Sequence, residues 1–139
     1  MKESPVKTKS FAFAIRIAKL FQWLCATKNE RALSKQILRC GTSIGANVEE
    51  AGGAFSEKEF FAKIQIAFKE ALETGYWLRL LRDTDYIEEN VFESLSTDCD
   101  ELIRILSAIT KTLREKSDGV HEAPDPDPFS LYAPPTPNS

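Results

Sequence analysis

Histidine is nearly absent from this 139-residue chain, and its scarcity excludes most catalytic machinery. The single histidine, His121, stands in a proline-rich stretch near the C-terminus. A Ser-His-Asp triad, a Cys-His pair or a multi-histidine metal site cannot be assembled around one such residue in one chain. Carboxylate pairs could act without histidine, but no position singles one out. The sequence therefore predicts a protein that is not an enzyme and that has no cofactor or metal site.

Cysteine is also sparse, with Cys25, Cys40 and Cys99 as the three in the chain. An odd number without a Cys-x-x-Cys spacing argues against a disulfide framework and against a zinc site. Each lies among apolar neighbours in a helix-like pattern, which is typical of small buried side chains in a reducing compartment. No apolar run approaches the roughly 20 residues of a membrane span, and the polar N-terminus lacks the apolar stretch of a signal peptide. We therefore expect a cytoplasmic protein.

Positive and negative charge are unevenly placed along the chain. Residues 1–48 carry nine Lys or Arg and two acids, residues 49–117 carry nine and fifteen, and residues 118–139 carry four acids and no base. The net charge of −3 therefore conceals a basic first half. Such asymmetry indicates either an anionic partner or a complementary protein surface.

Apolar residues make up 42% of the chain, and most recur at steps of three and four, the period of one helix face. Four such stretches predict helices near residues 10–27, 30–54, 56–82 and 88–116. Because the polar breaks between them are short, neighbouring helices must run antiparallel. The prediction is an all-α, up-down-up-down four-helix bundle over residues 10–117, preceded by a flexible segment at residues 1–9.

Each predicted helix carries one stripe of residues expected to face the core. These are Phe11, Ala14, Ile15, Ala18, Phe21, Leu24 and Cys25 in the first; Leu33, Ile37, Cys40, Ile44, Val48, Ala51 and Phe55 in the second; Phe61, Ile64, Phe68, Ala71, Gly75, Leu78 and Leu81 in the third; and Val91, Leu95, Leu102, Leu106, Ile109 and Leu113 in the fourth. In the first helix Phe13, Ile17 and Leu20 widen the apolar face, which suits a helix that touches several neighbours.

Helix ends and interior glycines give further signals. Asn29 is a plausible N-cap for the second helix, and Ser56-Glu57-Lys58-Glu59 is typical of a capping box. Gly41 and Gly45 fall inside the second helix, where each glycine costs roughly 0.5–1 kcal/mol relative to alanine. Close approach of another backbone is the simplest reason to retain them. Gly52-Gly53 either serves the same purpose or ends the helix.

The last part of the chain differs in character from the rest. Six of the seven prolines lie beyond Ser117, together with four acids and no helical periodicity. Residues 118–139 are therefore expected to form a disordered acidic tail. Within it, Phe129-Ser130-Leu131-Tyr132 is either a short docking motif or a few apolar residues present by chance.

The second and third helices carry a recognisable motif, Arg39 to Ala51, followed by Ser56 to Phe60, Ile66 to Ala71 and Tyr76 to Leu81. It resembles the signature of the four helix bundle protein family, some of whose members are encoded in intervening sequences of bacterial 23S ribosomal RNA genes. The resemblance covers about residues 10–116, with Cys40 in place of the usual small residue after the motif arginine.

The resemblance implies a four-helix bundle that assembles as a homopentamer. It also implies kinship with the accessory variability determinant of diversity-generating retroelements, a basic pentamer that binds nucleic acid and a reverse transcriptase. It supplies no settled biochemical activity. The motif residues Gly41, Thr42, Ser43, Gly45, Asn47 and Glu50 are interpreted as structural.

Basic residues of the first half could contact nucleic acid. One basic ridge on the second helix is formed, at steps of four, by Arg31, Lys35 and Arg39. Four more basic residues lie on or just before the first helix: Lys7, Lys9, Arg16 and Lys19. Clustered cations of this kind displace counterions from phosphate. A solvated face, or pairing with the acidic later helices of another subunit, explains them equally well.

Two other groups of residues allow both a functional and a structural interpretation. Ser43, Asn47 and Glu50 form a polar stripe that could contact a ligand or RNA, although a hydrogen-bond network fixing the register of the helices is favoured. The residues off the apolar stripes could form a subunit interface or be partly exposed by chance: Trp23, Tyr76, Trp77 and Leu80.

Two functions remain open from the sequence. The first is a non-catalytic oligomeric scaffold associated with RNA or another nucleic acid. The second is a protein–protein adaptor that recruits a partner through its bundle or its acidic tail.

Overall fold

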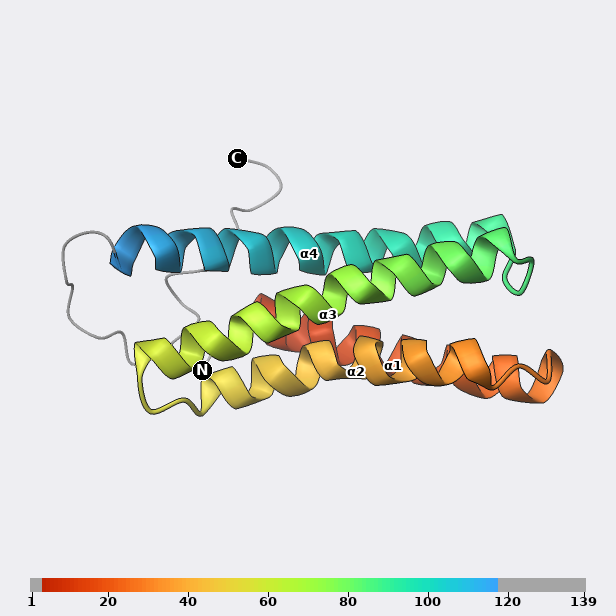
Figure 1. Cartoon of the computed structure of the whole chain (residues 1–139), viewed down its shortest axis with the longest axis horizontal. Coiled ribbons are helices and arrows are strands. Elements are labelled where there is room, and N and C mark those ends of the chain that lie inside the picture. Colours follow the sequence, from red (N-terminus) through yellow and green to blue (C-terminus); the bar gives the residue numbers. More distant parts are fainter. Residues whose placement is uncertain (1–3, 118–139) are drawn as a thin grey trace.

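The structure is a computed structural model, and it describes residues 4–117. Four helices follow one another: α1 (Pro5–Thr27), α2 (Ala32–Gly52), α3 (Glu57–Asp83) and α4 (Glu89–Ser117). Each helix packs against those before and after it, and α1 also packs against α4 (Figure 1). Residues 4–117 contain no strand. The predicted up-down-up-down bundle is confirmed, while the predicted tail at residues 118–139 lies outside the described residues.

Side-chain carboxylates and a hydroxyl cap the N-terminal ends of α2 and α3. Before α3, the Ser56 hydroxyl accepts a hydrogen bond from the Glu59 N–H, and the Glu59 carboxylate accepts one from the Phe55 N–H, each at 3.1 Å. The predicted Ser56 cap is therefore confirmed, while the Glu59 carboxylate reaches the N–H one residue before the one that a capping box uses. Before α2 the prediction was wrong, because Asn29 takes a left-handed conformation with φ of 52° and Glu30 accepts from the first N–H groups of the helix.

Helix α1 packs through the part of its predicted wide apolar face that holds Phe13, Ile17 and Leu20, and not through the main predicted stripe. It begins at Pro5 instead of Ser10. Its buried residues are Val6, Ser10, Phe13, Ile17, Leu20 and Leu24. Of the predicted stripe only Leu24 is buried, whereas Phe11 is 68% and Ile15 is 44% exposed. The two stripes lie side by side, and both have helical spacing, so the period alone could not decide between them.

The other three helices largely follow their predicted stripes, with corrections in each. In α2 the stripe is buried from Ile37 to Ala51, and Leu33 before it is only partly buried. The helix ends at Gly52-Gly53, and Phe55 beyond it is 98% exposed. In α3 the buried line runs through Phe60, Ile64, Ala67, Ala71, Thr74, Leu78 and Leu81. Phe61, Phe68 and Gly75 lie beside that line and are only partly buried. In α4, Phe92 is buried in place of Val91.

Two glycines explain how closely α2 approaches α1. A Cβ added at Gly41 would lie 2.8 Å from Cγ2 of Ile17, and one added at Gly45 would lie 3.2 Å from the carbonyl oxygen of Ser10. Both distances are shorter than ordinary van der Waals contact, so glycine permits this packing. The predicted close approach of another backbone is confirmed at Gly45.

Helices α3 and α4 do not pack evenly along their length. They lie close together at the turn that joins them and diverge toward the other end of the bundle, where α3 begins and α4 ends (Figure 1). No helix within residues 4–117 combines the length and the hydropathy needed to cross a membrane.

Candidate functional site

Four of the seven basic residues predicted to contact nucleic acid are paired with carboxylates of the same chain. Lys9 and Arg16 on α1 pair with Glu101 and Asp98 on α4, at 3.0 and 2.5 Å. Arg16 also donates to the hydroxyl of Ser94 at 2.7 Å. These contacts join the helices whose packing is least extensive.

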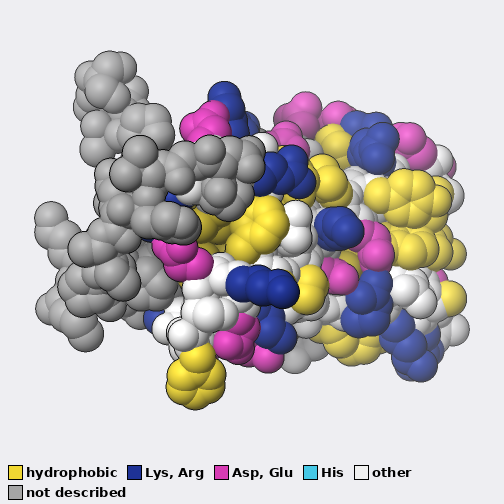
Figure 2. Space-filling model, turned by 60° about the vertical axis from the view of Figure 1, so that its left-hand side comes forward, with side chains coloured by type: hydrophobic (Ala, Val, Ile, Leu, Met, Phe, Trp, Pro, Cys, Tyr) yellow, Lys and Arg dark blue, Asp and Glu magenta, His cyan; other side chains and the backbone are white. Residues whose placement is uncertain are grey.

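The other two pairs involve α2. Lys7 lies 3.7 Å from the carboxylate of Glu49. The Arg39 guanidinium binds both Glu70, at 3.2 Å, and Glu73 on α3. The basic first half and the acidic second half therefore neutralise one another in part within one molecule. On the face drawn in Figure 2, Lys and Arg side chains alternate with carboxylates and hydrophobic side chains and do not form one continuous patch.

Three of the predicted nucleic-acid contacts have a different environment. Lys19, Arg31 and Lys35 are exposed, and within residues 4–117 none has a carboxylate at ion-pair distance. Arg31 instead donates to the side-chain oxygen of Asn29 at 2.5 Å. Since Arg31 and Lys35 are one turn apart, they are what remains of the basic ridge after Arg39 is paired.

The polar motif residues make contacts within the bundle. The side-chain amide of Asn47 donates to the carbonyl oxygen of Ser43 at 2.9 Å and reaches its hydroxyl at 3.0 Å. The Thr42 hydroxyl donates to the carbonyl oxygen of Leu38 at 2.6 Å. Glu50 accepts from Lys63 on α3 at 3.4 Å. These side chains thus bond within α2 or across to α3.

The residues predicted to form a subunit interface do not make one cluster. Trp23 is on α1, where Lys28 lies 5.6 Å from its ring centroid. The other three are on α3, which is not a neighbour of α1 in the bundle. Tyr76 is half-exposed and meets Trp77 edge to face at 5.1 Å. Trp77 packs against the core and donates to Glu73 at 3.2 Å, and Leu80 is partly buried.

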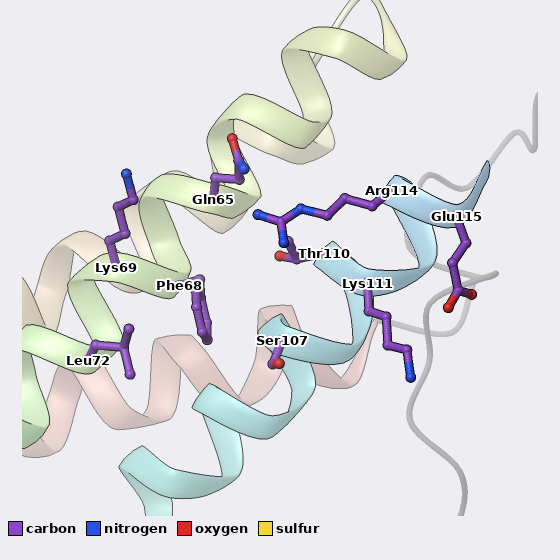
Figure 3. Close-up of a pocket in the computed structure, with 9 residues that line it drawn as sticks. All are labelled: Gln65, Phe68, Lys69, Leu72, Ser107, Thr110, Lys111, Arg114 and Glu115. Atoms are coloured by element: carbon purple, nitrogen blue, oxygen red, sulfur yellow. The ribbon is translucent and has the colours of Figure 1, made fainter. Parts of the chain in front are cut away.

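Sequence reasoning missed a groove where α3 and α4 diverge. It consists of two hollows of about 500 and 410 Å³ that share Gln65 and Arg114, and we call it the α3–α4 groove. Phe68 and Leu72 project into it from α3, and the Arg114 side chain reaches from α4 toward α3 (Figure 3). The spacing of Phe61, Gln65, Phe68 and Leu72, at steps of four, three and four, was the available signal for this second face of α3.

Cys40 and Cys99 are not activated nucleophiles. Burial raises the pKa of Cys40 to about 11 and that of Cys99 to about 12. Cys40 accepts a hydrogen bond from the Thr74 hydroxyl at 3.2 Å, and Cys99 donates to the carbonyl oxygen of Ala71 at 3.3 Å. Within residues 4–117 no group of three or more His, Cys, Asp or Glu side chains is placed to hold a metal ion. Nothing in this part of the chain points to catalysis.

Comparison with known proteins agrees with this geometry. The model of the 23S rRNA-intervening sequence protein family matches residues 2–108. A similar solved structure is a protein of unknown function from the S23 ribosomal protein family of Bacteroides thetaiotaomicron, 49% identical, with a TM-score of 0.75. The match covers 76% of this chain and 98% of that one. No curated protein matches the chain. The chain therefore belongs to the family of 23S rRNA-intervening sequence proteins.

Proposed function

We propose that this protein is a non-catalytic helical scaffold that works as a homo-oligomer. The observation that carries the proposal is the exposed apolar face of α1. Phe11 and Ile15 stand one turn apart on α1 and are 68% and 44% exposed. Apolar residues at helical spacing on an exposed face favour packing against another protein surface.

The energetics of such contacts support assembly. Burying a side chain such as phenylalanine or isoleucine contributes about 1.5–3 kcal/mol. In a closed ring the α1 face of each subunit would pack against the next subunit. The free energy from burying Phe11 and Ile15 would then be gained at every interface. A homopentamer is the state that the family resemblance implies, and we adopt it as the number of subunits.

Light scattering of the purified chain tests this proposal. We expect an oligomer of five subunits for the natural chain and a loss of assembly in the double variant Phe11→Lys, Ile15→Lys. Phe55→Lys is the matched control, because Phe55 is a more exposed phenylalanine outside the helices. A monomeric natural chain, or an oligomer that survives the double substitution, would contradict the proposal.

Association with nucleic acid is a second candidate function. Lys19, Arg31 and Lys35 support it, because they are exposed and have no carboxylate partner within residues 4–117. Repeating a weak basic site in every subunit of an oligomer would add avidity. If nucleic acid does not bind, the scaffold serves as an adaptor for a protein partner. We place it in the cytoplasm, which the three free thiols support.

A further inference from the structure

The floor of the α3–α4 groove is apolar. Phe61, Phe68 and Leu72 come from α3 and Leu113 comes from α4. Phe61 and Phe68 are only partly buried and Leu72 is exposed, although the first two pack against the core. Covering exposed apolar surface with a ligand removes it from water, which favours binding.

The rim of the same groove is basic. Five basic residues line it: Lys58 and Lys69 on α3, and Lys111, Arg114 and Lys116 on α4. Two acids, Glu57 and Glu115, also line it. Lys116 is paired with Glu57 at 2.7 Å. Lys58, Lys69 and Lys111 have no carboxylate at ion-pair distance within residues 4–117, in contrast to the paired cations of α1. The groove is thus suited to a ligand that is both acidic and apolar.

The chain itself contains a segment with this chemistry. Residues 118–139 carry four acids and no Lys or Arg, and they include the apolar run Phe129-Ser130-Leu131-Tyr132. The segment starts directly after Ser117, one residue beyond Lys116 at the rim of the groove. We propose that the α3–α4 groove binds this C-terminal segment of its own chain, with its acids at the basic rim and its apolar run on the apolar floor.

The length of the segment allows this docking. The groove residues on α4 run from Ser107 to Lys116, which is about 14 Å at roughly 1.5 Å per residue. The residues from Asp118 to Tyr132 can span up to about 50 Å at roughly 3.3 Å each. Covalent attachment also gives a high effective concentration, on the order of millimolar, so modest contacts suffice.

The apolar floor decides between this occupant and nucleic acid. A phosphate backbone would match the lysines of the rim but would leave Phe68 and Leu72 without an apolar partner. The C-terminal segment matches both parts of the groove. The inference is independent of the oligomeric state, because every element of the groove belongs to one chain.

Zero-length carbodiimide cross-linking of the full chain, followed by mass spectrometry, tests the proposal. This reagent joins a lysine amine to a carboxylate only when the two are in contact. We expect links from Lys69 or Lys111 to Asp125 or Asp127. Asp118 is not diagnostic, because it follows the helix directly. The paired Lys116 and Glu57 provide the positive control within the same sample, and exposed Lys35 on α2 provides the negative one.

Two further arms make the result decisive. Substituting Phe129, Leu131 and Tyr132 by serine keeps every charge, and we expect at least a five-fold drop in the yield of links to Lys69 and Lys111. Mixing labelled and unlabelled protein distinguishes links within one chain from links between chains. The proposal is overturned if Lys116–Glu57 links form without groove links, if Lys35 is linked equally, if the serine variant links as well, or if all links join two chains.

Discussion

Gly45 of α2 faces the backbone of Ser10 on α1, and a Cβ at Gly45 would lie 3.2 Å from the Ser10 carbonyl oxygen. A leucine at this position must force the two helices apart, and overpacking of this kind costs about 1–3 kcal/mol. We expect Gly45→Leu to lower the free energy of unfolding by about 1–3 kcal/mol, as measured by urea denaturation.

Gly75 provides the matched control for this substitution. It lies inside α3, and a Cβ added there would meet nothing within 4 Å. Gly75→Ala is therefore expected to raise stability by about 0.5–1 kcal/mol, because alanine is the better helix former. If Gly45→Leu is as stable as the natural chain, the close contact between α1 and α2 does not constrain the fold.

The same contact explains what the sequence could predict of the fold. Four helical periods with short polar breaks were enough for the helices and for their antiparallel order. The period could not choose between the two apolar stripes of α1. That choice depends on Gly41 and Gly45, which bring Ile17 and Ser10 against α2, and Ser10 is polar, so a hydrophobic pattern passes over it.

Of the candidate site, the sequence could predict the charge of each half of the chain but not which charged side chains pair. A basic first half and an acidic second half are plain in the sequence. Which cations are neutralised depends on the tertiary arrangement, which brings Arg16 to Asp98, 82 positions later in the chain, and Arg39 to Glu70. The α3–α4 groove was missed because Phe61 and Phe68 were assigned to the core, and the divergence of two helices has no local sequence signal.

Glu30 is expected to make the free energy of unfolding depend on pH. Its carboxylate accepts from the N–H groups of Ala32, Leu33 and Ser34 at 2.8–2.9 Å. Burial alone would raise the pKa of Glu30, but these hydrogen bonds favour the charged form, and the pKa is lowered from its ordinary value of 4.5. A pKa lower in the folded state than in the unfolded state gives stability above pH 4.5 that is lost as the pH falls through the folded value.

Glu30→Gln isolates this contribution. We expect the variant to be less stable than the natural chain at pH 7, and the difference to narrow as the pH is lowered below 4.5. Urea denaturation at a series of pH values measures both quantities. Glu93→Gln, at an exposed position on α4, is the control. A difference for Glu30→Gln that is the same at pH 7 and at low pH would show that the carboxylate charge does not stabilise α2.

The three cysteines should differ sharply in reactivity. Burial raises the pKa of Cys40 to about 11 and that of Cys99 to about 12, and both side chains are buried, whereas Cys25 is only partly buried. Because the thiolate is the reactive form, an aromatic disulfide reagent at pH 8 is expected to label Cys25 first. Cys40 and Cys99 should react only at the rate of unfolding. Rapid labelling of all three in the folded protein would contradict the packing of α2, α3 and α4.

Arg31 and Lys35 provide the sharpest test of nucleic-acid binding. With Lys19 they are the predicted contacts that no carboxylate neutralises within residues 4–117. If three such cations contact single-stranded RNA, the logarithm of the binding constant should fall with the logarithm of salt at a slope of about −2 per chain. Fluorescence anisotropy of a labelled RNA at several salt concentrations measures this slope.

Neutralising substitutions separate these cations from the paired ones. Arg31→Gln with Lys35→Gln is expected to remove most RNA binding. Lys9→Gln with Arg16→Gln should weaken it little, because those side chains are already bound to Glu101 and Asp98. Equal loss in both variants would mean that overall charge, and not this site, controls binding. If the natural chain does not bind RNA even at low salt, Arg31 and Lys35 are a solvated face, and the scaffold acts through protein contacts alone.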